Sequence, residues 1–284
     1  MPNPQEKLAQ SLESLKSLQE EGQIAIRSRD FSQRHRELLL KNGFIQKVMR
    51  GWYIASRPDD RPGDTTPWYT SFWEFCVDYC NERFGDQWCL SAEQSIQIHV
   101  GNRTVPKQLI VRTPKGGNKP ISLLHETSIF DYRGSIPDRE AMVVQGRMNL
   151  YRLPNALIEA TATFFSRNST DARAALAAIP GAATLLPILL DGGHSTIAGR
   201  LCGAFRNIGR DNVADEIKKT MRSVGYDVPE SDPFEDKIQW EVQQRTISPH
   251  AARMKLMWQT MRQEIVDKFP SPPSPVLTLS LIHI

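Results

Sequence analysis

The spacing of apolar residues at the start of the chain predicts two helices with a strand between them. Leucines recur every three or four positions from Leu8 to Leu18, which places them on one side of a helix that ends near Gly22. The apolar run at 24–27 predicts a short strand. Asp30 and Gln33 then have the spacing of a capping box, which predicts the start of a second helix that runs through Lys41.

The next apolar runs predict a β-hairpin. Asn42-Gly43 ends the second helix with residues that tolerate a left-handed conformation. The runs at 44–48 and 51–54 read as two short strands, and Gly51 supplies the positive φ that a tight turn needs. Helix, strand, helix and hairpin is the element order of a winged helix-turn-helix.

The pattern from residue 64 to about 150 mixes helices and strands. Residues 68–80 predict a helix with a buried aromatic side, capped by Gly85, and 88–90 predict a strand. Ser91 is a suitable N-cap for a helix through His99. The runs at 109–112 and 121–124 predict two strands, and we interpret the Gly-rich segment between them as a hairpin turn. That segment lacks the spacing of a phosphate-binding loop.

Helical spacing dominates the rest of the chain. Helices are predicted at 154–162, 170–179 and 253–269, and Ser195 is expected to cap another helix. In that helix Gly199, Cys202 and Gly203 form a strip of small residues that permits close helix packing. Asp191, His194 and Ser195 are too close in sequence to face one another as a catalytic triad.

These patterns together predict an α+β fold. We expect a winged helix-turn-helix at 1–57, a mixed α/β domain at 64–150 and a helical segment at 151–270. Residues 271–284 are expected to be a Pro/Ser linker followed by a non-native tail. The tail, Leu279–Ile284, matches the translation of the transposase end sequence used in sequencing libraries. We therefore expect that the reading frame was cut off before a further domain.

Composition favours an ordinary cytoplasmic protein. Hydrophobic residues make up 40% and charged residues 24%. The N-terminus lacks a signal-peptide pattern, and the apolar stretch at 174–190 is broken by prolines, so no membrane partner is expected. The four cysteines are expected to be buried free thiols. Cys76 and Cys80 lack a second pair at a spacing suited to zinc, so no metal site is predicted.

Positive charge is concentrated in the N-terminal unit. The net charge of the whole chain is only +3, yet between residues 24 and 57 basic residues far outnumber Asp30 and Glu37. The start of the second helix and the hairpin carry side chains that reach base edges and phosphates. The predicted DNA-binding residues are Ser32, Gln33, Arg34, Arg36, Lys41, Lys47 and Arg50. A protein-docking role, or a merely solvated surface, remains open.

A second group of basic residues lies in the helical segment. It consists of Arg200, Arg206, Arg210, Lys218 and Lys219. These side chains either form a second basic face or belong to a solvated helix surface, and the sequence does not distinguish the two.

Two sets of sequence segments resemble known bacterial families. Residues 43–53, Gly-Phe-Ile-Gln-Lys-Val-Met-Arg-Gly-Trp-Tyr, resemble the winged-helix signature of AbiEi-type antitoxins. Residues 63–73, 105–109 and 190–195 look like parts of the long N-terminal extension of a group of Fic-domain proteins. The resemblance covers nearly all of residues 10–272.

The resemblance implies a non-catalytic, toxin-antitoxin-like region of a larger protein. Fic enzymes transfer AMP from ATP to a hydroxyl group with a His-Pro-Phe-x-x-Gly-Asn-Gly-Arg loop, and none of the six histidines here precedes proline. No catalytic residue and no cofactor is therefore assigned to this chain. ATP and Mg would belong only to the missing Fic domain, which would be a partner. The alternative is a protein-interaction module that recruits targets to that domain or restrains it.

Overall fold

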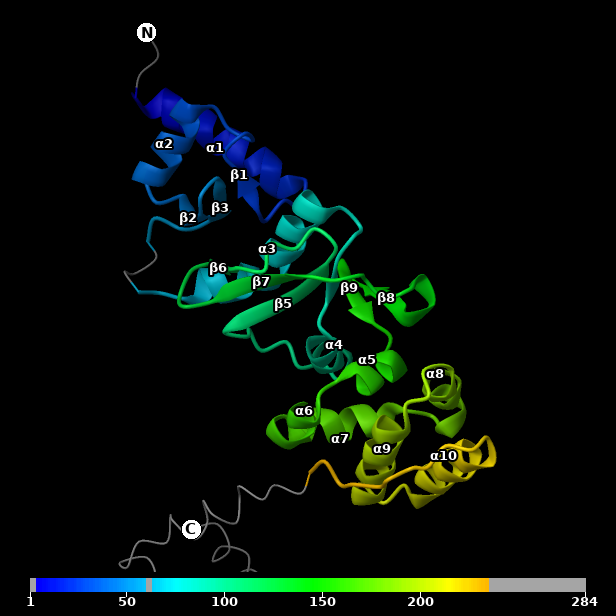
Figure 1. Cartoon of the computed structure of the whole chain (residues 1–284). Helices are drawn as coiled ribbons and strands as arrows, with labels where there is room; N and C mark the ends of the chain where they lie inside the picture. The colour runs from blue at the N-terminus through cyan, green and yellow to red at the C-terminus, as the bar shows by residue number, and fades with distance from the viewer. Residues whose placement is uncertain (1–3, 60–62, 235–284) are drawn as a thin grey trace, which may run out of the picture. The chain divides into compact units, whose positions relative to one another are not determined.

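The computed structural model describes residues 4–59 and 63–234, which fall within one compact unit (Figure 1). Helices and three small sheets make up this part of the chain, so the predicted α+β class is confirmed. The helix predicted at 253–269 and the linker and tail at 271–284 lie outside the described residues. None of the described helices is both long and apolar enough to cross a membrane.

The N-terminal elements follow the predicted order. They are α1 (Pro4–Glu20), β1 (Ile26–Arg27), α2 (Gln33–Lys41), β2 (Ile45–Met49) and β3 (Trp52–Ala55). The strands form an antiparallel sheet of order β1-β3-β2, and Gly51 at the hairpin tip has φ +83°, as predicted. A small core lies between the helices and the sheet, formed by Leu15, Ile26, Phe31, Leu39, Ile45 and Tyr53.

The start of α2 differs from the prediction. Ser32, not Asp30, is the N-cap, and its hydroxyl accepts from the His35 amide at 3.2 Å. The Asp30 carboxylate instead turns back to β1, where it accepts from the Arg27 amide at 2.7 Å. The capping-box prediction is therefore wrong, because the Arg27 backbone amide, three residues before Asp30, takes the carboxylate that was expected to accept from the Gln33 backbone amide.

The middle part contains α3 (Thr66–Phe84), β4 (Cys89–Leu90), α4 (Ala92–His99), β5 (Gln108–Thr113), β6 (Pro120–Ser122), β7 (Ser128–Arg133), β8 (Met142–Gln145) and β9 (Met148–Tyr151). Helices α3 and α4 and the N-cap Ser91 are as predicted, and the Ser91 hydroxyl accepts from the Gln94 amide at 3.3 Å.

The predicted hairpin between β5 and β6 is wrong. The sheet order is β4-β5-β7-β6, so β7 lies between them, parallel to β5 and antiparallel to β6. The Gly-rich segment bonds to β7 instead, with the Asn118 amide donating to the Asp131 carbonyl at 2.9 Å. A Cβ on Gly116 would lie 2.5 Å from the Tyr132 backbone, so only glycine permits this approach.

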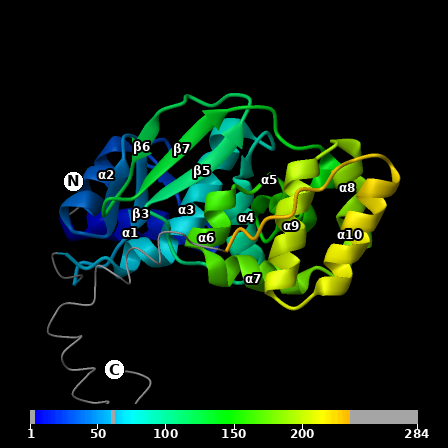
Figure 2. The same ribbon diagram turned by 60° about the horizontal axis from the view of Figure 1, so that its bottom comes forward.

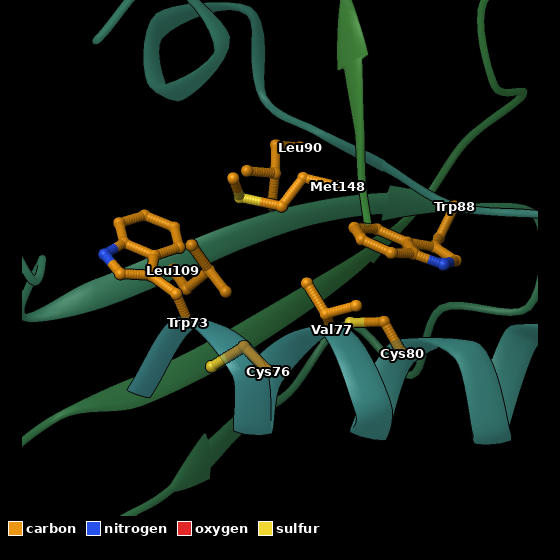
Figure 3. Close-up of a pocket in the computed structure, with 8 residues that line it drawn as sticks. All are labelled: Trp73, Cys76, Val77, Cys80, Trp88, Leu90, Leu109 and Met148. Atoms are coloured by element: carbon orange, nitrogen blue, oxygen red, sulfur yellow. The ribbon is translucent and has the colours of Figure 1, made fainter. Parts of the chain in front are cut away.

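Helix α3 supplies the buried aromatic side that the sequence predicted. Trp68, Phe72 and Phe75 are fully buried, and the Trp68 indole donates to Thr127 Oγ1 at 3.0 Å. Figure 3 shows Cys76, Val77 and Cys80 of this helix lying toward Leu90, Leu109 and Met148 from three strands. The space among these side chains does not admit a water molecule, so it is packed core. All four cysteines are buried and free, as predicted.

The C-terminal part of the described chain is helical. It contains α5 (Leu153–Glu159), α6 (Ala162–Arg167), α7 (Ser169–Ala178), α8 (Leu186–Asp191), α9 (Ser195–Asn207) and α10 (Asp211–Ser223). Ser195 was expected as the N-cap of α9, but it is the first helical residue; His194 occupies the cap position, with no side-chain cap bond.

The small-residue strip of α9 faces an extended segment. A Cβ on Gly199 would lie 1.9 Å from the Pro229 carbonyl oxygen, and one on Gly203 would lie 2.1 Å from that of Ser231. In Figure 2 the segment after α10 crosses α9. At Gly199 and Gly203 the strip therefore permits close approach of this segment, so the expected helix packing is wrong there. Cys202 does pack against a helix as expected, because its thiol donates to the Ala214 carbonyl of α10 at 3.4 Å.

Most of the second basic group is occupied by contacts inside the fold. Arg200 donates to the Ala160 carbonyl at 2.7 Å and lies over the Phe165 ring, and burial lowers its pKa. Arg210 donates to carbonyls at the end of α7, and Lys218 pairs with Glu230 at 2.8 Å. Arg206 bonds to Asp211, Asp215 and Glu230. These arginines and Lys218 do not form a free basic face.

Candidate nucleic-acid interface

One stripe of α2 presents cationic side chains to solvent. Arg34 and Lys41 are both exposed, and their seven-residue spacing places them on the same side of the helix. Glu37 lies between them in this stripe, and its Oε1 accepts from Gln33 Nε2 at 2.9 Å. Helix α2 therefore offers two positive groups and one negative group to a partner.

The hairpin adds two more cations. Lys47 is exposed on β2, and Arg50 is exposed in the turn next to Gly51. The pairing of β2 with β3 shifts between Lys47 and Met49, and such a bulge increases local twist. Arg34, Lys41, Lys47 and Arg50 form no ion pair with any residue in 4–59 or 63–234. We call this set the basic surface.

Other residues of the predicted site support the fold. The Ser32 hydroxyl caps α2, and Arg36 Nη1 donates to the Ser28 carbonyl at 2.9 Å. Arg36 is half-buried, and its contact holds the loop that leads into α2. The structure thus places Arg36 beside the basic surface and gives it a bond inside the protein.

Two arginines of the N-terminal cluster are neutralised by α3. Both Arg27 and Arg29 form ion pairs with Glu82, and Arg27 also pairs with Asp30 at 3.3 Å. Sequence reasoning missed Glu82 because more than fifty residues separate it from its partners, and a lone glutamate on a helix gives no signal of such a pair. The number of unpaired positive charges in the N-terminal unit is therefore smaller than the number of basic residues in its sequence.

The N-terminal elements, α1 to β3, are attached to α3 by polar and aromatic contacts. The Ala25 amide donates to Asp78 Oδ2 at 3.1 Å, and Arg147 pairs with Asp78 Oδ1 at 2.5 Å. The Trp52 ring contacts Phe75 and Tyr79 at centroid distances of 5.9 and 5.5 Å. Figure 1 shows β1 and β3 close to α3. These contacts hold the β1-β3-β2 sheet, which carries part of the basic surface, against α3.

No group of three or more His, Cys, Asp or Glu side chains that could hold a metal ion occurs in the part of the chain that the structure describes. The buried thiols are poor nucleophiles, because burial raises the pKa of Cys89 to about 12 and that of Cys202 to about 11. The exposed lysines and arginines at α2 and the hairpin can bind anions.

Comparison with known proteins gives little further information. No protein-family model matches the chain, and no curated protein matches it. A solved structure with a similar course is the crystal structure of the RV2827C protein from Mycobacterium tuberculosis, with a TM-score of 0.46 and 11% identity. The match covers 71% of this chain and 78% of that chain. A likeness at this level assigns neither a family nor a function.

Proposed function

We propose that this chain is a non-catalytic DNA-binding and regulatory region that contacts DNA through the basic surface. The observation that supports this function is the set of exposed cations without an internal partner on α2 and on the adjoining hairpin. Other arginines of the N-terminal unit, by contrast, are occupied by Glu82, Asp30 and the Ser28 carbonyl. Phosphate contacts from lysine and arginine supply most of the affinity of such surfaces for DNA.

The roles within the basic surface follow from position. Arg34 lies in the first turn of α2, the part of a recognition helix that meets base edges in a major groove. Lys47 and Arg50 lie on the hairpin, where a wing contacts the flanking backbone. Ser32 and Arg36 hold the start of α2 in place. Gln33 lies at the start of α2 and Lys41 at its end, and these two side chains would contact bases and phosphates.

We further propose that the parent protein is a bacterial, toxin-antitoxin-like Fic-family protein that transfers AMP. This proposal rests on the family resemblance of the sequence segments at 43–53, 63–73, 105–109 and 190–195. ATP and Mg would bind to a Fic domain outside this sequence, and the present chain would control or target it in the cytoplasm.

A second candidate is a protein-interaction module that recruits targets to that Fic domain or restrains it. Leu40 on α2 favours this candidate, because this apolar residue is 36% exposed on the same helix and can contact an apolar partner. Glu37 in the same stripe would also repel DNA phosphates. The DNA experiment below separates the two candidates.

The test is a salt titration of binding to a DNA site selected from a random pool and to random DNA. Arg50→Ala should weaken binding about equally on both DNAs and lower the salt slope by about one unit, as expected for a lost phosphate contact. Arg34→Ala should cost roughly 1 to 3 kcal/mol on the selected site and less on random DNA. Lys219→Ala, an exposed cation on α10, is the matched control and should leave both affinities unchanged.

Folding of each variant is checked by circular dichroism. Wild-type protein that binds no DNA at low salt would refute the DNA function. The protein-interaction candidate would then be tested by binding of the chain to a purified Fic domain, with Leu40→Ser as the variant expected to weaken it.

A further inference from the structure

A pocket of about 320 Å³ lies where the winged helix meets α3. Its walls come from the segment before β1, from β1 and β3, from one side of α3, and from the turn between β8 and β9. Ligand sites commonly occupy junctions of this kind, and the volume is at the lower end of the range of about 300 to 1,000 Å³ found for small-molecule sites. The basic surface and its DNA function do not involve this pocket.

The charged groups in the walls already satisfy one another. Arg27 pairs with Asp30 and Glu82, while Arg147 pairs with Asp78 at 2.5 Å and with Glu74 at 3.8 Å. Asp78 has both oxygens occupied, because Oδ2 accepts from the Ala25 amide. An ionic ligand would have to break one of these pairs and leave a charge without its partner. The walls therefore favour an uncharged ligand.

Neutral polar groups in the same walls retain unused hydrogen-bonding capacity. Asn81 Oδ1 accepts from the Trp88 indole at 2.8 Å, which leaves the Asn81 amide nitrogen as a donor. Gln23 Nε2 donates to the Ala25 carbonyl at 3.1 Å and to Asp30 at 2.7 Å, which leaves Gln23 Oε1 as an acceptor. Within residues 4–59 and 63–234, neither atom has a further partner.

The Trp52 side chain gives the pocket an aromatic wall. Its contacts with Phe75 and Tyr79 are steeply inclined, with interplanar angles of 74° and 68°, and no described ring stacks on it in parallel. Its indole N–H also has no acceptor among the described residues. A flat heterocycle can stack on such a ring, and stacking of a base on an aromatic side chain contributes about 1 to 3 kcal/mol.

We propose that this pocket binds a nucleobase or nucleoside. The class combines the required properties: it is uncharged, planar, and carries donors and acceptors on one edge for Gln23 Oε1 and the Asn81 amide nitrogen. A nucleotide phosphate is not expected to contribute, because both arginines in the walls are already paired with carboxylates.

The test is isothermal titration of the full chain with the common nucleosides and, in a second arm, with their 5′-monophosphates. At least one nucleoside should bind saturably, and its monophosphate should bind no more tightly. Trp52→Phe keeps an aromatic ring in place but replaces the indole by a smaller ring with less area for stacking, and it should weaken binding about tenfold. Asn81→Asp keeps the acceptor for Trp88 and removes the donor, so it should have a similar effect.

Trp73→Phe is the matched control. Trp73 also lies on α3, but its indole donates to the Arg103 carbonyl at 2.9 Å and it does not line this pocket. Its nucleoside affinity should equal that of the wild type. The proposal is overturned if no nucleoside binds, if only the monophosphates bind, or if Trp52→Phe binds as tightly as the wild type. Trp52→Phe leaves an aromatic ring between β3 and α3, so the test holds even if Asn81→Asp does not fold.

Discussion

Replacing Gly199 on α9 by alanine should destabilise this protein. In an exposed helix interior the same change stabilises by about 1 kcal/mol, because alanine has the higher helix propensity. Here the added Cβ would lie 1.9 Å from the Pro229 carbonyl oxygen and 2.6 Å from its carbon. Both atoms are backbone, so the crossing segment must move away.

The size of the effect follows from the contacts that this movement disturbs. Inserting a methyl group into a packed site costs about 1 to 3 kcal/mol. The shift also strains the hydrogen bond from the Ser231 amide to the Gly199 carbonyl, 3.3 Å long, which contributes about 1 kcal/mol. After the gain in helix propensity, we expect a net loss of about 1 to 3 kcal/mol, or a melting temperature lower by about 2 to 10 °C.

Urea unfolding followed by circular dichroism measures this loss as a lower midpoint with an unchanged slope. Gly181→Ala is the control, because no atom lies within 4 Å of its added Cβ and its φ of −177° is accessible to alanine. The control should lie within about 0.5 kcal/mol of the wild type. A Gly199→Ala protein as stable as the wild type, or more stable, would show that the segment at 229–231 does not pack on α9.

Further predictions concern the thiols and Glu82. Native protein should react slowly with a thiol reagent near pH 8, and rapid labelling of Cys89 or Cys202 before unfolding would contradict their burial. Because the folded pKa of Cys89, about 12, exceeds its unfolded value of 9.0, its contribution to stability should be complete below pH 9 and should be lost between pH 9 and 12. Glu82→Gln should lower the free energy of unfolding by at most about 1 kcal/mol, since the pair is partly exposed. It should also strengthen DNA binding by releasing Arg29, whereas Glu74→Gln, with its 3.8 Å pair, should leave DNA affinity unchanged.

The elements that the sequence predicted well are those determined by local signals. Leucine spacing located α1, the Asn42-Gly43 stop ended α2, and Gly51 marked the hairpin tip. Ser91 was recognised as a cap because its hydroxyl and the amide it accepts from lie three residues apart. Each of these features depends on residues within one or two turns of the chain, so periodicity and turn chemistry are sufficient to find them.

The features that the sequence did not reveal depend on distant partners. Strand β7 enters the sheet between β5 and β6, and nothing in the local pattern distinguishes this parallel pairing from a simple hairpin. The same holds for the charge of the candidate site. Arg27 and Arg29 look as available as Arg34 and Arg50 in the sequence, and only the position of Glu82 on α3 separates the two pairs.

The attachment of the N-terminal elements to α3 has a consequence for protein engineering. Ala25, Val48 and Ile54 belong to the N-terminal elements, yet they pack into the same hydrophobic cluster as Phe75 and Tyr79 of α3. A graft of residues 1–57 onto another protein would expose these side chains to water and would remove the acceptor of the Ala25 amide. A graft of these elements should therefore extend through Phe84, the last residue of α3, so that the sheet keeps its supporting helix.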